Sequence, residues 1–204
     1  IITMDGDDAK DFDDAISIKK LDNSNYMLGV HIADVSHYVK EGTALGLDAS
    51  ERGTSVYLVD RVIPMIPHQL SNGICSLNPN VDRFAMTCDM EIDSNGKIVK
   101  YDIYNSVIKS SLRMTYNKAN LVLEKNEIPE GYENFVKELS MMKDLSKILR
   151  NMRNRRGQID FDVPEVKVIV NEEGHPIEIK ERERGTGEKL IEDFMLAANE
   201  TVAE

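Results

Sequence analysis

The chain has 204 residues, of which 41% are hydrophobic and 30% are charged, and its formal net charge is −11. This length supports one domain with a sizeable core, and no apolar run is long enough to span a membrane. The negative charge argues against a nucleic-acid partner unless cations gather locally and bound metal ions offset the carboxylates. No secretion signal is visible, so we expect a cytoplasmic location. Cys75 and Cys88 have no histidines at ligand spacing, and we therefore expect them to be free buried thiols.

An acidic segment is the first informative element. Six of the ten residues from Asp5 to Asp14 are aspartates, and only Lys10 offsets them. Apolar residues on both sides indicate that these carboxylates lie at the edge of a core. A solvated loop is the simplest interpretation, and an EF-hand fails because Ala9 and Lys10 occupy two of its required positions. Aspartate oxygens are hard ligands, so we favour a Mg²⁺ or Mn²⁺ site of the kind that serves phosphoryl transfer.

The elements that follow are mostly short in the first half of the chain. They are strands at 15–19, 26–33 and 55–59, a helix at 42–52, and one or two helical turns at 68–74. A hairpin is the clearest local signal, because Asn95-Gly96 separates alternating apolar residues at 84–92 from those at 99–103. The second half is mainly helical, with helices at 115–124, at 135–156 and from 186 onward, and a hairpin at 166–170 and 177–179.

These elements predict an α+β fold with a mixed, mostly antiparallel sheet packed with helices. We expect residues 1–204 to form one domain. Because the sequence starts without methionine and stops inside a predicted helix, we also expect it to be a piece of a longer protein.

Several motifs together resemble one family. The segment TMDGDDAKDFDDAI, from Thr3 to Ile16, is similar to the signature of the RNB catalytic domain, found in ribonuclease II and ribonuclease R. Further blocks resemble the same family in the same order, namely VHIADVSHYV at 30–39, IPMIP at 63–67, SLNP at 76–79 with Asp82-Arg83, and EDFMLAAN at 192–199. The block at 30–39 favours the ribonuclease R branch.

The resemblance implies processive, hydrolytic 3′→5′ degradation of single-stranded RNA to nucleoside 5′-monophosphates, with Mg²⁺ or Mn²⁺. The four essential aspartates of the family correspond to Asp5, Asp11, Asp13 and Asp14. Asp13 matches the position whose loss abolishes cleavage and leaves RNA binding intact. The family arginine that holds the scissile phosphate and the flanking cold-shock and S1 RNA-binding domains are expected outside this sequence, so this piece alone is expected to be weakly active or inactive.

The resemblance also implies a clamp for the end of the RNA. Tyr57 and Phe161 match two aromatic rings that grip the terminal nucleotides, and any base offers a face on which such rings can stack. Ordinary core aromatics are the alternative for both. Glu192 matches an acidic residue near the last nucleotide, and its alternative is an exposed position on an amphipathic helix.

Two other patterns have structural and functional interpretations. Arg150, Arg153, Arg155 and Arg156 suit an RNA channel, although they also stand at a helix C-terminus, where cations are stabilising, and we favour that interpretation. His31 and His37 flank Asp34, yet no third ligand completes a zinc site. A non-catalytic, acidic metal-binding or protein-binding module remains the alternative function.

Overall fold

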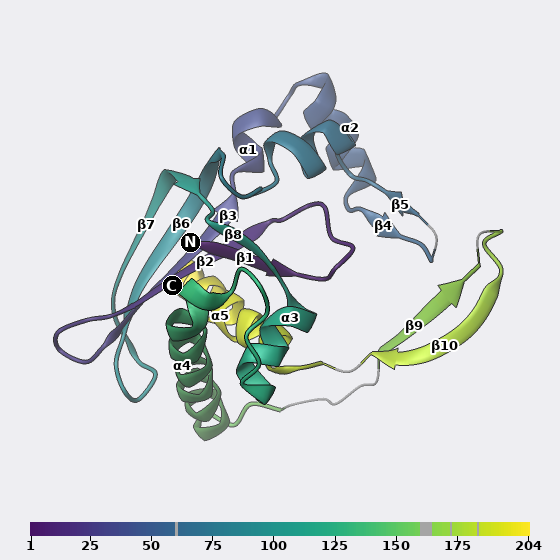
Figure 1. Cartoon of the computed structure of the whole chain (residues 1–204). Helices are drawn as coiled ribbons and strands as arrows, with labels where there is room; N and C mark the ends of the chain where they lie inside the picture. Colours follow the sequence, from purple (N-terminus) through teal and green to yellow (C-terminus); the bar gives the residue numbers. More distant parts are fainter. Residues whose placement is uncertain (60, 160–164, 172, 183) are drawn as a thin grey trace.

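The computed structural model describes residues 1–59, 61–159, 165–171, 173–182 and 184–204. Its centre is a six-stranded sheet in the order β7-β6-β3-β2-β1-β8 (Figure 1). The strands are β1 (Ile2–Asp5), β2 (Asp14–Lys20), β3 (Tyr26–Ala33), β6 (Asp82–Ile92), β7 (Ile98–Lys109) and β8 (Leu112–Thr115). Neighbouring strands run antiparallel except β1 and β8, which are parallel. The predicted α+β class with a mostly antiparallel sheet is therefore confirmed.

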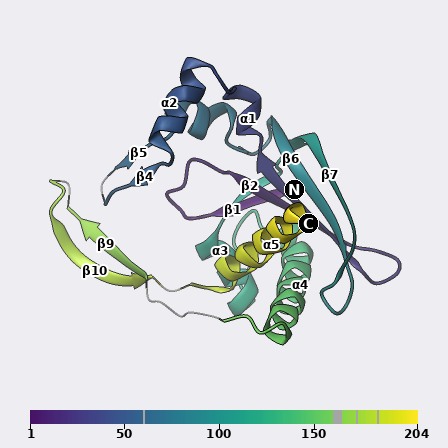
Figure 2. The same cartoon turned by 180° about the vertical axis from the view of Figure 1, so that it is seen from behind.

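Two long helices pack on one face of this sheet. The helices of this layer are α3 (Tyr116–Asn120), α4 (Val136–Arg155) and α5 (Thr186–Ala203). In Figure 2, α4 and α5 lie side by side against the sheet, and they contact each other and its strands. Fully buried side chains from both layers meet there, among them Leu28, Met90, Leu139, Leu149 and Phe194. Burying each of these stabilises the fold by about 1.5–3 kcal/mol before conformational entropy is counted.

The opposite face carries a smaller apolar cluster. Its buried members are Phe12, Ala15, Ala33, Leu77, Ala85 and Ile108. Because side chains alternate along a strand, Ala15 points away from its neighbour Ile16, which belongs to the main core. Phe12 comes from the acidic segment and is only 4% exposed. This ring therefore attaches the acidic segment to the second face of the sheet.

Smaller elements lie outside the sheet. Between β3 and β6 the chain forms α1 (Val35–Tyr38), α2 (Ala44–Arg52), β4 (Val56–Tyr57), β5 (Val62–Ile63) and a π-helix (Gln69–Ile74). Strands β9 (Glu165–Val170) and β10 (Pro176–Arg182) form a separate hairpin. Figure 1 shows this hairpin projecting from the body of the molecule, on the same side as β4 and β5.

Most of the local predictions are confirmed. Gly96 adopts a positive φ of 86° in the predicted hairpin, and Gly53 ends α2 at a φ of 71°. Thr115 caps α3 as predicted, because its hydroxyl accepts a hydrogen bond from the Lys118 N–H at 3.4 Å. Both cysteines are free and buried. No helix in the described part of the chain is long and apolar enough to cross a membrane.

Other predictions need correction. The strand predicted at 55–59 contains only two residues. The helical turns predicted at 68–74 are present, but they have π-helical geometry from Gln69 to Ile74. The helix predicted at 115–124 changes to a π-helix after Asn120. Strands β1 and β8 were not predicted, because each has only four residues and their pairing joins positions about a hundred residues apart. Such a short strand has too little periodicity to be recognised.

Candidate metal centre

The acidic segment is held to the sheet by its own backbone. It leaves β1 at Asp5 and enters β2 at Asp14. Between them, the Phe12 N–H donates to Ser76 Oγ at 2.9 Å, and the Phe12 carbonyl accepts from the Leu77 N–H at 2.9 Å. The SLNP block singled out in the sequence therefore anchors the acidic segment at Phe12, which argues against the interpretation as a wholly solvated loop.

The carboxylates of this segment act on one another electrostatically. Burial raises the pKa of Asp14 to about 6, and the charges of Asp5 and Asp13 add to the rise. Desolvation also raises the pKa of Asp13, followed by the charges of Asp11 and Asp5. Asp13 stays open to solvent whereas Asp14 Oδ2 is shielded, so the larger shift is expected at Asp14. The four predicted ligands thus lie near enough to repel one another.

These carboxylates do not form a ready-made cage. Asp5 Oδ1 accepts a hydrogen bond from the Gly6 N–H at 2.7 Å, and Asp11 Oδ2 accepts one from the Tyr57 hydroxyl at 3.3 Å. Within the described residues, no three His, Cys, Asp or Glu side chains are arranged to hold one ion. Asp14 Oδ2 has no hydrogen-bond partner among those residues. The hard oxygen donors and this shielded oxygen fit a divalent cation, provided that Asp5 and Asp11 turn toward it.

A cavity of about 700 Å³ opens beside the acidic segment. One wall comes from residues 5–9 of the acidic segment, and another from Tyr57 at the end of β4 and the two residues that follow it. The remaining walls come from Tyr116 and Asn117 of α3, Val166 and Val168 of β9, and Glu188 of α5. Tyr57 is 68% exposed and lines this cavity, so the ring is not a core aromatic. A second cavity of about 480 Å³, lined by Lys10 and His68 among others, lies along residues 8–11. The acidic segment therefore borders two openings.

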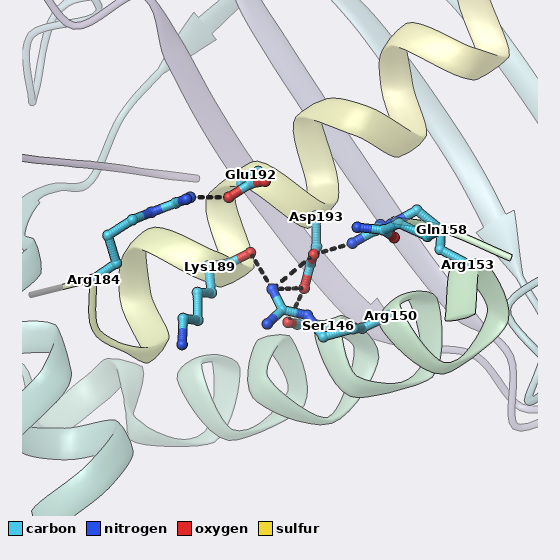
Figure 3. A network of polar contacts seen from close by, with 8 residues as sticks. All are labelled: Ser146, Arg150, Arg153, Gln158, Arg184, Lys189, Glu192 and Asp193. Carbon is cyan, nitrogen blue, oxygen red and sulfur yellow. Dashed lines mark hydrogen bonds and ion pairs between the residues drawn. The ribbon is translucent and has the colours of Figure 1, made fainter. Parts of the chain in front are cut away.

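The other two predicted RNA contacts, Glu192 and Phe161, are not among the described residues that line this cavity. Glu192 is exposed on α5 and forms an ion pair with Arg184, and it does not line the cavity (Figure 3). Glu188, one turn earlier, does line it. Phe161 lies outside the described residues, so its position beside Tyr57 stays a prediction.

The arginine cluster at the end of α4 is structural. Figure 3 shows Arg150, Arg153 and Ser146 turned toward Asp193 of α5. Asp193 is fully buried, with Arg150 Nη2 at 3.1 Å from its Oδ1 and with Arg153 and Ser146 bound to it as well. Arg156 Nη1 lies 2.8 Å from Glu200 Oε2 on the same helix α5. These three arginines therefore have a structural role, as favoured, but the contacts that show it are ion pairs with α5 and not the predicted stabilisation of the helix end.

The histidines do not form a metal site with Asp34. His31 is buried between Ser17 Oγ, at 3.0 Å from its Nε2, and Thr87 Oγ1, at 2.8 Å from its Nδ1. The His37 ring stacks on Phe84 with centroids 4.2 Å apart. Asp34 caps α1 by accepting from the His37 N–H at 3.0 Å. Each group thus has a local structural role, as the sequence suggested.

Two residues near the acidic segment were missed. Arg113 and Asn117 both contact Asp7, from β8 and α3. No signal in the sequence marks them, since they stand more than a hundred residues after Asp7.

Comparisons with known proteins agree with this geometry. The RNB domain model matches residues 1–204. Ribonuclease R of Thermotoga maritima is 58% identical over 205 residues, which span 100% of this chain and 29% of that protein. Two structures of Mycoplasma genitalium ribonuclease R are similar, one with double-stranded RNA and one with ribose-methylated single-stranded RNA. Each has a TM-score of 0.94 and 35% identity over 99% of this chain, covering 36% and 31% of those chains.

Proposed function

Because this chain belongs to the RNB domain family, we propose that it is the catalytic part of a 3′→5′ exoribonuclease. The proposed substrate is single-stranded RNA, degraded processively and hydrolytically to nucleoside 5′-monophosphates. Support comes from relatives that are named ribonuclease R, one of them solved with single-stranded RNA. Those relatives are much longer than this chain, so we also propose that flanking cold-shock and S1 domains assist in binding RNA.

Mg²⁺ or Mn²⁺ is the proposed cofactor, and Asp5, Asp11, Asp13 and Asp14 are its proposed ligands. When bound by these carboxylates, a pair of such ions would supply Lewis-acid chemistry at the scissile phosphate, for an attacking water and for the leaving oxygen. Asp14 begins β2, so the sheet determines its position. Asp11 and Asp13 flank the buried ring of Phe12, which therefore anchors both carboxylates.

Asp13 is the proposed catalytic aspartate. Its carboxylate is open to solvent, so water and RNA can reach it. Its pKa is raised by desolvation and by the charges of Asp11 and Asp5. A raised pKa suits a group that orients the attacking water or accepts its proton.

The end of the RNA is proposed to stack on Tyr57. This ring is exposed in the cavity wall, and its hydroxyl donates to Asp11, so a base resting on it would lie next to the acidic segment. Phe161 is the proposed second ring of the clamp. Glu192 is a proposed contact to the last nucleotide, and this role requires its ion pair with Arg184 to open.

The observation that carries this proposal has two parts. The charge of Asp5 adds to the raised pKa values of Asp13 and Asp14, so these carboxylates lie close together, and Asp5 lines one cavity with the exposed ring of Tyr57. We expect the full-length protein to shorten a 5′-labelled single-stranded RNA from its 3′ end in Mg²⁺ or Mn²⁺ and to stop in EDTA. Chromatography of the products should give nucleoside 5′-monophosphates. Cleavage that continues unchanged in EDTA would show that the reaction does not require a metal ion.

The net charge of −11 favours the alternative of a non-catalytic, acidic metal-binding or protein-binding module, because RNA binding normally relies on clustered cations. That alternative predicts tight Ca²⁺ binding by the chain and no RNA cleavage by the full-length protein in any divalent ion. The same assay therefore separates the two functions.

A further inference from the structure

Arg113 lies beneath the acidic segment at the edge of the sheet. It belongs to β8, which pairs in parallel with β1 so that Arg113 is opposite Thr3 and Thr115 is opposite Asp5. The acidic segment starts where β1 ends. An arginine in this register therefore stands beside the point at which the segment leaves the sheet.

One guanidinium contacts both halves of the acidic segment. Arg113 Nη2 donates to the Asp7 carbonyl oxygen at 2.7 Å, in the first half. Its Cζ lies 4.9 Å from the centroid of the Phe12 ring, in the second half. The turn between the halves is closed by the Ala9 N–H, which donates to the Gly6 carbonyl at 3.2 Å. Arg113 thus connects the limb that carries Asp5 with the limb that carries Asp11, Asp13 and Asp14.

Asn117 holds the first half from a second direction. Its side-chain amide donates to the Asp7 carboxylate from the second residue of α3, the helix that directly follows β8. The backbone and the side chain of Asp7 are therefore both bound. This gives Asp7 a function as an attachment point, distinct from that of the proposed ligands around it.

Fold stability alone is a poor explanation for Arg113. Its Nε is shielded from solvent and has no hydrogen-bond partner among the described residues. An unpaired buried donor destabilises a fold, and an apolar side chain beside Phe12 would avoid that penalty. Among the described residues, the hydrogen bond and the ring contact of the Arg113 guanidinium both lead to the acidic segment.

We propose that Arg113, with Asn117, is a positioning residue that holds the two limbs of the acidic segment together, so that Asp5 on the first limb stays close to the carboxylates of the second. The inference rests on the proposed function. Lysine cannot replace arginine fully, because a planar guanidinium can lie over a ring and donate in its own plane at the same time, whereas an ammonium group cannot. Removing Arg113 would leave both limbs attached to the sheet but free to separate.

The test compares Arg113→Met, Arg113→Lys and Asn117→Ala in the full-length protein. Arg52→Met serves as the matched control, because Arg52 makes an exposed ion pair with Asp48 on α2. Calorimetry measures Mn²⁺ binding without RNA, and hydrogen exchange in EDTA measures protection of residues 6–12. We expect Arg113→Met to weaken Mn²⁺ binding by about 10-fold or more, as residues that orient metal ligands do, and to speed exchange in 6–12.

Kinetics separate positioning from a purely structural role. For Arg113→Met we expect kcat to fall and the KM for RNA to change less than about 2-fold, with Arg113→Lys intermediate and Arg52→Met like wild type. Wild-type Mn²⁺ affinity and exchange rates in both Arg113→Met and Asn117→Ala would overturn the inference. If Arg113→Met does not fold, Asn117→Ala and Arg113→Lys decide. A wild-type protein that neither binds Mn²⁺ nor cleaves RNA would instead overturn the proposed function.

Discussion

Two charge-dense regions of this molecule have opposite electrostatics. Between α4 and α5, the fully buried Asp193 is compensated by Arg150 and Arg153. In the acidic segment, Asp13 and Asp14 meet other carboxylates, and the pKa of each is raised. A buried charge that the protein itself neutralises connects elements of the fold. Like charges that are held close together raise the free energy of the folded state, and such a cluster indicates a binding or catalytic site.

The largest expected effect concerns catalysis. We predict that Asp13→Asn in the full-length protein lowers kcat for single-stranded RNA by roughly 10²–10⁴-fold, the usual contribution of a group that handles a proton in the reaction. The Kd for RNA should stay near the wild-type value. Single-turnover cleavage and filter binding measure the two quantities, and Asp48→Asn on α2 is the control. Wild-type cleavage by Asp13→Asn would contradict the assigned role.

The second effect concerns stability. We predict that Asp193→Asn lowers the free energy of unfolding by about 3–5 kcal/mol, because it leaves the Arg153 guanidinium buried without its partner charge. Urea denaturation followed by circular dichroism measures the change. Glu200→Gln removes the exposed partner of Arg156 and should cost less than about 1 kcal/mol. Equal effects of the two substitutions would mean that burial does not distinguish these ion pairs.

A pH titration tests one buried base. Burial lowers the pKa of His31 from 6.5 to about 4. The folded state therefore keeps this imidazole neutral while the unfolded chain takes up a proton, so stability is lost as the pH falls from about 6.5 to 4. A tenfold change in proton affinity corresponds to about 1.4 kcal/mol, so the loss is on the order of 3 kcal/mol. The unfolding free energy, measured at several pH values, should depend less steeply on pH between about 6.5 and 4 in His31→Gln than in the wild type.

Asp14 is expected to give the opposite slope in the same range. Its pKa is raised from 3.8 to about 6, so without metal the folded carboxyl binds a proton more readily than the unfolded one. Stability then rises as the pH falls from about 6 toward 3.8. In EDTA, Asp14→Asn should remove this rise and be more stable than wild type at pH 7. A less stable Asn variant at pH 7 would show that the Asp14 charge is compensated.

The smallest effect concerns Tyr57. Tyr57→Ala should raise the KM for RNA about 10-fold, since stacking of one base contributes about 1–3 kcal/mol. Tyr57→Phe keeps the ring and loses only the long, exposed hydrogen bond to Asp11. A change of less than about 3-fold is expected for it, because exposed hydrogen bonds contribute little. Steady-state kinetics measure both, and equal losses would assign the effect to the hydroxyl.

Local elements were predictable because their signals are contiguous. Asn95-Gly96 sits between two alternating runs, and the apolar spacing over α4 is repeated for five turns, so periodicity was sufficient for both. The aspartates were recognisable as a site from their density and their motif. Glu188 and the partners of Asp7 were not, because their relevance depends on contacts across the fold.

Residue type and spacing were enough to predict most of the secondary structure and the family and to propose the aspartates as a site, because these signals act over a few neighbouring positions. Which charges are compensated depends instead on the folded chain. The fold pairs the Arg153 guanidinium with the Asp193 carboxylate across 40 residues, and it brings the Arg113 guanidinium to the Asp7 carbonyl oxygen across 106 residues. Both contacts depend on distance in space, and for Arg113 that distance follows from how the sheet brings β1 and β8 together.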